Sequence, residues 1–175
     1  VLTTGATNTA VGYVSLDALT TGSNNTAVGW SSLGATTTAN DNTAVGKNSM
    51  LINTEGYSNT AIGIYSLRQN TTGDNNVAVG QSALLTNTTG DDNTAVGYNA
   101  LYYNTASDNT AVGMTAMEAN TTGTKNVAVG FEALHLNTTG GNNIAIGMQA
   151  LHANTTANYN IAIGEATMGA NTTGT

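Results

Sequence analysis

The chain has no cysteine, no proline and few charged residues, and these shortages exclude several classes of protein. Without cysteine it has neither a disulfide framework nor a zinc site built on cysteine ligands. Charged residues make up 7% of its 175 positions, against roughly 25% in typical soluble domains. Three Lys and Arg stand against ten Asp and Glu, which gives a formal net charge of −7. A chain this poor in cations is not expected to neutralise nucleic-acid phosphates, so nucleic acid is not an expected partner.

Long apolar runs are missing as well, since no stretch of about 18 consecutive apolar residues is available to span a bilayer. Disorder fits poorly, because disordered chains are rich in charge and poor in β-branched residues. Here Thr and Asn fill 33 and 25 positions, and Gly fills 21 more. A composition this biased indicates internal repetition.

A five-residue motif, Asn-(Thr/Val/Ile)-Ala-(Val/Ile)-Gly, occurs ten times. Its glycines are Gly12, Gly29, Gly46, Gly63, Gly80, Gly97, Gly113, Gly130, Gly147 and Gly164. They are 17 residues apart, except for a spacing of 16 between Gly97 and Gly113. In every copy Leu or Met stands four residues after the glycine, and Thr stands eight after it. We interpret residues 1–175 as a single repeat array, and we expect it to be a window of a longer array or a unit that stacks end to end.

The repeat predicts an all-β fold, a parallel β-solenoid of ten 17-residue coils. A unit of this length is too short for helical-hairpin repeats, and Thr, Asn, Gly and Val are poor helix formers. Alternation around the Asn-x-Ala-x-Gly motif is typical of a short strand. Parallel coils of this kind are expected to stack at roughly 4.8 Å.

The invariant asparagine four residues before each glycine is expected to form a ladder of stacked amides that runs from coil to coil. The predicted ladder is Asn25, Asn42, Asn59, Asn76, Asn93, Asn109, Asn126, Asn143 and Asn160, with Asn8 in the same column. Two arrangements remain open. Either Asn, Ala and Gly face the interior and Val/Ile form an exposed stripe, or Val/Ile and Leu/Met face inward. The uniformly small residues of the Ala column favour the first.

Repeats such as Asn-Val-Ala-Val-Gly at 76–80, Asn-Thr-Ala-Val-Gly at 93–97 and Asn-Ile-Ala-Ile-Gly at 143–147 resemble the head repeats of YadA-type trimeric autotransporter adhesins. Longer forms such as 93–101 also resemble arrays in phage tail fibres and other surface fibres. The resemblance implies a left-handed β-roll in which three chains pack through the Val/Ile face, and a function in binding rather than catalysis. The adhesin repeat is usually shorter, and the Asn-Thr-Thr-Gly half is not its standard second half.

Several columns are candidates for ligand binding. Glu118, His135 and His152 occupy one column in successive coils, as a weak candidate for a zinc site. Four turn carboxylates, from Asp74, Asp91, Asp92 and Asp108, raise the question of calcium, but the nine-residue calcium repeat is missing. Aromatic residues share the column after glycine as a candidate sugar platform: Tyr13, Trp30, Tyr98 and Phe131. We expect no cofactor, and no catalytic set of residues is recognisable.

The Asn and Thr columns suggest two further hypotheses, glycosylation and ice binding. Seven Asn-x-Thr acceptor sequences are candidates for glycosylation, at Asn24, Asn70, Asn87, Asn120, Asn137, Asn154 and Asn171. The alternative is that Asn-Thr-Thr-Gly supplies turn chemistry. The Thr column, from Thr20 to Thr172, would suit an ice-binding array if its hydroxyls faced water.

Together these features predict a structural extracellular fibre or adhesin shaft, not an enzyme. The expected location is extracellular, at a cell surface or in a virion fibre. The expected partner is the chain itself, as a trimer or an end-to-end polymer, with a host or surface glycan or protein as a further candidate. The alternative is a module that binds ice or glycan on the same solenoid scaffold.

Overall fold

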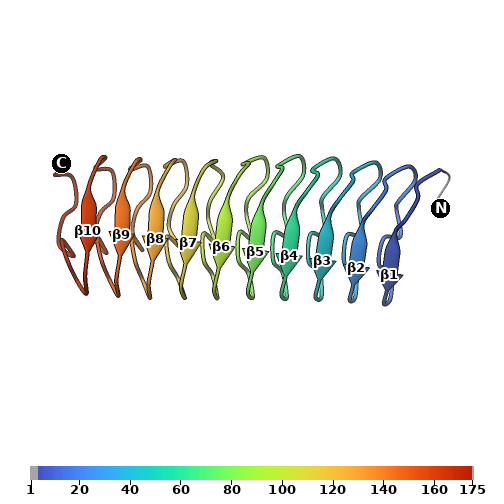
Figure 1. Cartoon of the computed structure of the whole chain (residues 1–175), viewed down its shortest axis with the longest axis horizontal. Coiled ribbons are helices and arrows are strands. Elements are labelled where there is room, and N and C mark those ends of the chain that lie inside the picture. The colour runs from blue at the N-terminus through green and yellow to red at the C-terminus, as the bar shows by residue number, and fades with distance from the viewer. Residues whose placement is uncertain (1–3, 175) are drawn as a thin grey trace.

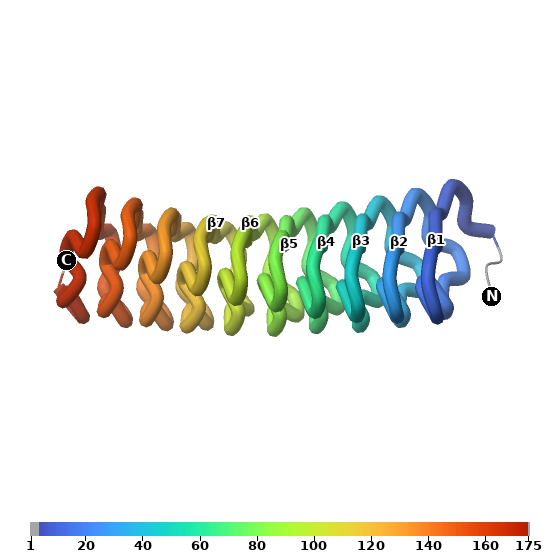
Figure 2. Tube along the Cα trace, turned by 90° about the horizontal axis from the view of Figure 1, so that it is seen from below, coloured from blue at the N-terminus to red at the C-terminus, as the bar shows by residue number. Residues whose placement is uncertain are grey.

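The computed structural model describes residues 4–174, which form one continuous rod of stacked coils (Figure 1). The ten strands are β1 (Thr9–Val11), β2 (Thr26–Val28), β3 (Thr43–Val45), β4 (Thr60–Ile62), β5 (Val77–Val79), β6 (Thr94–Val96), β7 (Thr110–Val112), β8 (Val127–Val129), β9 (Ile144–Ile146) and β10 (Ile161–Ile163). They form a single sheet in sequence order, and β1 and β10 lie at opposite ends of the rod (Figure 2). The all-β parallel solenoid predicted from the repeat is confirmed.

Every strand pairs in parallel with the next, and the register never shifts. Thr26 of β2 faces Thr43 of β3, and Thr94 of β6 faces Thr110 of β7. The backbone of each strand donates to the coil on either side; for example, the amides of Thr26 and Gly29 bond to the carbonyls of Asn42 and Val11 at 2.8 Å. Nine steps of about 4.8 Å place β1 and β10 about 43 Å apart. Within the described residues there is no helix of the length and apolarity needed to cross a membrane.

The coil bends through residues with positive φ, three of them in each repeat besides the glycine. In the fourth coil they are Tyr65 (61°), Leu67 (48°) and Asn75 (56°). The third of these positions precedes the ladder asparagine, and six of its ten residues are Asn or Asp. Asn and Asp tolerate the left-handed region better than other non-glycine residues. Their frequency in the turn therefore follows from backbone conformation.

The interior is narrow and is filled by small residues, one large apolar side chain per coil and asparagine. The central Ala of β2 to β10 is buried, and so is the Leu or Met four residues after each glycine in all but the last coil. The largest fully buried side chains include Leu33, Met50, Leu67, Leu84, Leu101, Met117, Leu134 and Leu151. Burying a side chain of this size stabilises a fold by about 1.5–3 kcal/mol.

The first of the two arrangements, which the Ala column favoured, is right for the strand, and the second is right only for the Leu/Met position. The Val/Ile position of the strand faces outward, with exposures of 41% for Ile62 and 37% for Val112. The Leu/Met position faces inward, as Leu101 and Met117 show with 0% exposure. The solenoid therefore buries a core of its own and still carries an apolar outer column.

One coil is a residue shorter than the others, between Gly97 and Gly113. The strands on either side keep their register, so the turn absorbs the missing residue. In this turn Asn104 donates to the carbonyl of Ala106 two residues away, where other coils bond over three residues. As a result the buried Oδ1 of Asn87 has no hydrogen-bond partner.

Candidate functional site

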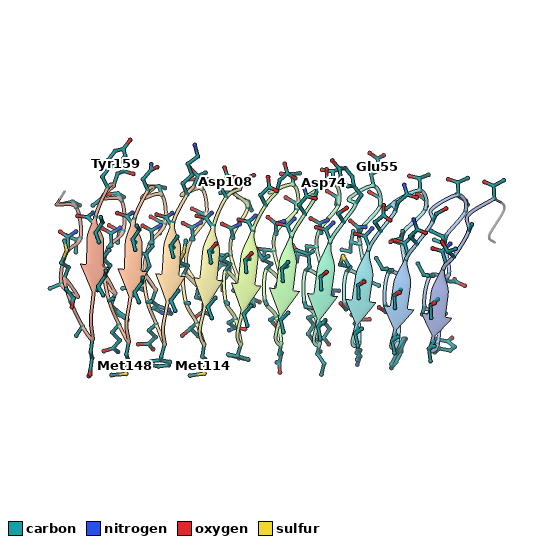
Figure 3. The ribbon with its side chains drawn as sticks, in the orientation of Figure 1. Glu55, Asp74, Asp108, Met114, Met148 and Tyr159 are labelled. Carbon is teal, nitrogen blue, oxygen red and sulfur yellow. The ribbon has the colours of Figure 1, made fainter. Side chains whose placement is uncertain are left out.

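The solenoid presents four long surfaces. We define them by counting residues from the glycine that closes each strand. The sheet face carries the outward residues of the strands. The glycine edge carries the residue after each glycine, including Met114 and Met148, and the turn edge lies opposite, with Glu55, Asp74 and Tyr159 (Figure 3). The return face carries the residues two, five and six positions after each glycine.

The asparagines four residues before the glycines form the internal ladder. The amide N–H of Asn76 donates to Oδ1 of Asn59 at 2.9 Å, and Nδ2 of Asn76 donates to the Gly90 carbonyl at 2.9 Å. The backbone bond of this pattern recurs at every ladder asparagine from Asn25 to Asn160. Asn25, Asn42, Asn59, Asn76, Asn93, Asn109, Asn126 and Asn143 are fully buried, and Asn160 is 4% exposed. Buried amides of this kind are satisfied only while the coils remain stacked.

Most of the candidate glycosylation sites are a second internal ladder, which corrects the expectation from the sequence. Five of the seven asparagines are fully buried: Asn70, Asn87, Asn120, Asn137 and Asn154. Their Nδ2 atoms donate along the column, for example from Asn137 to Asn120 Oδ1 at 2.8 Å. A glycan needs this same nitrogen, so the folded coil cannot carry one there. Asn24 is exposed and Asn171 is partly exposed.

The turn carboxylates support the backbone and do not converge on a cation site. Asp91 Oδ1 accepts the amide N–H of Asp74 at 2.8 Å, and Asp74 Oδ1 accepts that of Tyr57 at 2.8 Å. Asp92 and Asp108 occupy the positive-φ position before the ladder asparagine. The sequence pattern placed Asp74 only among candidate calcium ligands, and its hydrogen bond to the backbone of the neighbouring coil was not predicted. The sequence feature that indicates this role is the recurrence of Ser, Asn and Asp in the column of Asp74, because the side chains of these residues accept hydrogen bonds.

Tyr57 reports the negative charge of the turn edge. The nearby Asp74 carboxylate raises the pKa of the Tyr57 phenol, first by its charge and then by a side-chain hydrogen bond. Asp91 and Asp92 add to this increase through their charges. An ionised Tyr57 would be repelled by the same carboxylates. Any stabilising effect of the neutral phenol is therefore lost as the pH rises above 10.0, the ordinary pKa of tyrosine, and through the raised pKa of Tyr57.

The weak zinc candidate, Glu118, His135 and His152, is brought together on the return face but not with converging donors. His135 Nδ1 lies 3.7 Å from Glu118 Oε2, and the two imidazoles stack with centroids 5.3 Å apart. His152 Nε2 instead lies 3.5 Å from Glu132 Oε2. The arrangement is two neighbouring Glu–His pairs. Among residues 4–174 no group of three His, Asp or Glu side chains has the geometry to hold a metal.

The aromatic residues of the glycine edge do not form a flat platform. Tyr13 and Trp30 meet edge to face, with centroids 6.1 Å apart and planes at 83°. Lys47 Nζ lies 4.8 Å above the Trp30 ring and covers it from the next coil. Tyr98 and Phe131 alternate with Met114 and Met148 further along. This edge is irregular, because Lys47, Gln81 and Glu165 interrupt its apolar residues.

Two hollows open on the return face, where the coils differ in side-chain size. The first, of about 370 Å³, is lined by Val14, Asp17, Ser31, Gly34, Ala35, Leu51 and Ile52. Gly34 and Ala35 are the smallest residues of this lining. The second, of about 570 Å³, is lined by Asn48, Tyr65, Arg68, Gln69, Gln81, Ser82, Leu85 and Tyr102. Most of these residues carry a side-chain donor or acceptor, so the second hollow is the better candidate for a ligand rich in polar groups.

The sheet face becomes more apolar along the chain. The first outward position of the strand is Thr in β1 to β4, β6 and β7, but it is Val127 in β8, Ile144 in β9 and Ile161 in β10. The second outward position is Val or Ile throughout. Both outward columns are therefore apolar from β8 to β10. An apolar surface of this length is typical of an interaction site.

Comparison with known proteins found no matching protein-family model, no matching curated protein and no matching solved structure.

Proposed function

We propose that this chain is a rigid structural segment of an extracellular fibre or adhesin shaft, and that it associates with further copies of itself through the sheet face. The observation that carries the proposal is the ten-stranded parallel sheet in constant register. Each coil is bonded to the next by backbone hydrogen bonds and by buried asparagine amides. Bending such a rod would break many of these bonds at once, so stiffness is the property that the fold supplies.

The proposed self-association is supported by the apolar outer columns. Ile62, Val112, Val129 and Ile146 are each 36–41% exposed although each lies on a strand that is paired on both sides. Apolar side chains that repeat every coil would bury a continuous strip against a second copy of the same strip. The sequence resemblance to YadA-type head repeats, in which the Val/Ile face is the contact between chains, supports the same surface.

The proposal is tested by introducing charge on the sheet face. The double variant Val96→Glu and Val129→Glu should weaken self-association at least about tenfold, because equivalent carboxylates would meet across a symmetric interface. Sedimentation velocity over a concentration series measures the change, and electron microscopy shows whether fibres or bundles persist. Circular dichroism should remain that of the wild type, since both side chains face outward.

A matched control carries the same charge elsewhere. Thr89→Glu and Thr122→Glu alter exposed turn residues and should leave assembly unchanged. The proposal is wrong if the wild-type chain stays monomeric at all concentrations, or if both double variants assemble as the wild type does.

Ice binding has less support than the shaft. In seven coils the hydroxyl of the Thr eight residues after the glycine donates to a carbonyl of the next coil, as Thr71 does to Thr88 at 2.9 Å. These hydroxyls hold the coils together and do not offer a free donor array to water. Glycan binding is favoured by the polar lining of the second hollow of the return face.

A further inference from the structure

We propose that the second hollow of the return face binds a carboxylated oligosaccharide, with the ligand carboxylate on Arg68. This inference does not depend on self-association of the chain, because the return face and the sheet face are different surfaces of the rod. We call this hollow the Arg68 groove; its lining is Asn48, Tyr65, Arg68, Gln69, Gln81, Ser82, Leu85 and Tyr102.

Arg68 has unused hydrogen-bonding capacity. Its Nε is buried and has no hydrogen-bond partner, and no carboxylate within residues 4–174 forms an ion pair with it. Its guanidinium lies against Tyr65, with Cζ 5.7 Å from the ring centroid. A guanidinium is a planar fork of five N–H donors that matches a carboxylate in a two-bond geometry. An unpaired, partly buried guanidinium beside a hollow therefore favours a carboxylate ligand.

The side-chain amides of the groove have no hydrogen-bond partner among residues 4–174 either. Amides further along the return face do have partners. Asn48, Gln69 and Gln81 make no side-chain hydrogen bond to another described residue. Further along the face, Asn99 donates to Glu118 at 3.1 Å, and Gln149 donates to Glu132 at 2.8 Å. The polar side chains there bond to one another, whereas those of the Arg68 groove remain available to a ligand.

The mixture of groups indicates the class of ligand. Primary amides and phenols each donate and accept, which suits hydroxyl groups that do the same. Tyr65 and Tyr102 add apolar ring surface for the C–H face of a sugar ring. The lining residues come from four successive coils, from Asn48 to Tyr102, so the groove extends over three steps of about 4.8 Å each. An elongated, hydroxyl-rich ligand with a carboxylate fits this set better than a compact anion.

The experiment measures binding of three carboxylated tetrasaccharides by calorimetry: tetragalacturonate, tetramannuronate and a hyaluronan tetrasaccharide. At least one should bind, and its methyl ester should bind at least about tenfold more weakly because the ester cannot accept the two charge-assisted bonds. Arg68→Gln should weaken binding to a similar degree. Arg68→Lys should also weaken it, since lysine keeps the charge and loses the fork.

The control is Lys125→Gln, which removes one positive charge from an exposed turn. It should bind the oligosaccharide as the wild type does, and circular dichroism checks that every variant is folded. The proposal is overturned if none of the three tetrasaccharides binds, or if the methyl ester binds as tightly as the acid. It is also overturned if Lys125→Gln weakens binding as much as Arg68→Gln, or if tetraglutamate binds equally well. The last result would indicate an acidic peptide instead.

Discussion

At the scale of single residues, the glycine that closes each strand is the most constrained position of the coil. Gly80 has a φ of 131°, and a Cβ built there would lie 2.5 Å from the carbonyl oxygen of Gly97 in the next coil. Both the backbone conformation and the space exclude a side chain. The same two conditions hold along the column from Gly12 to Gly147, so the coils approach one another as closely as they do only because this residue is glycine.

We therefore expect Gly80→Ala to destabilise the chain strongly. The unfavourable φ alone costs about 1–3 kcal/mol, and the overlap with Gly97 adds to it. Gly34→Ala is the matched control, because its Cβ would lie 3.2 Å from a flexible Leu51 methyl group, at a residue without positive φ. That change should alter stability by less than about 1 kcal/mol. Urea denaturation of both variants measures the difference, and equal stabilities would contradict this account of the column.

At the scale of one structural element, the short coil is the weakest link in the asparagine ladders. Its turn reads Asn104-Thr-Ala-Ser-Asp-Asn109, whereas a complete turn reads Asn154-Thr-Thr-Ala-Asn-Tyr-Asn160. In the complete turn Asn154 donates to Asn137 Oδ1 at 2.8 Å. In the short turn the corresponding bond to Asn87 is missing, and a buried acceptor remains unsatisfied.

Inserting one Thr between Thr105 and Ala106 should restore the complete turn and give Asn87 its partner. Satisfying one buried polar group is worth about 1–3 kcal/mol, so the denaturation midpoint should rise. An equal insertion between Thr88 and Thr89 would create an 18-residue coil and should lower the midpoint. If the two insertions change the midpoint in the same direction, the missing residue is not the cause of the unsatisfied acceptor.

At the scale of the whole molecule, each coil contacts only its neighbours, as is usual in repeat proteins. Contacts between strands join β1 to β2, β2 to β3 and so on, with no contact between strands further apart. Length and stability are therefore expected to change in steps of one coil. The proposed function as a shaft depends on this property, because a longer array would give a longer rod with the same cross-section.

Deleting residues 47–80, which are two whole coils, should leave a folded rod about 10 Å shorter. Gly46 would then be followed by Gln81, and each column would keep its residue type. Small-angle X-ray scattering measures the length, and circular dichroism measures the β content. Deletion of residues 47–72, about one and a half coils, would place every following residue out of register and should disrupt the fold. Equal β content in the two deletions would contradict the modular description.

The repeat by itself determined the architecture. Ten copies of one pattern of about 17 residues place equivalent residues in equivalent surroundings when each copy forms one coil and the coils stack. The repeat also placed the Asn ladder, since an invariant amide needs an equivalent partner in the next coil. The uniformly small Ala column favoured an outward direction for Val/Ile, but the alignment left the direction of Leu/Met open, because an apolar side chain suits either an interior or an interface between chains. Nor could it show that Asn70 or Asn137 is buried, since Asn-Thr-Thr is both a turn and a glycosylation sequence.

Only the tertiary structure shows which side chains point into the coil and which point out. This direction depends on the positive-φ bends. These bends turn Leu101 and Asn137 inward and leave Val112 outside. They also bring Arg68 beside Tyr65 and the free amides of neighbouring coils, in columns that show no shared residue type. A repeated column can be recognised in the sequence because its members are alike. A site made of unlike residues from four coils exists only once the coils are stacked.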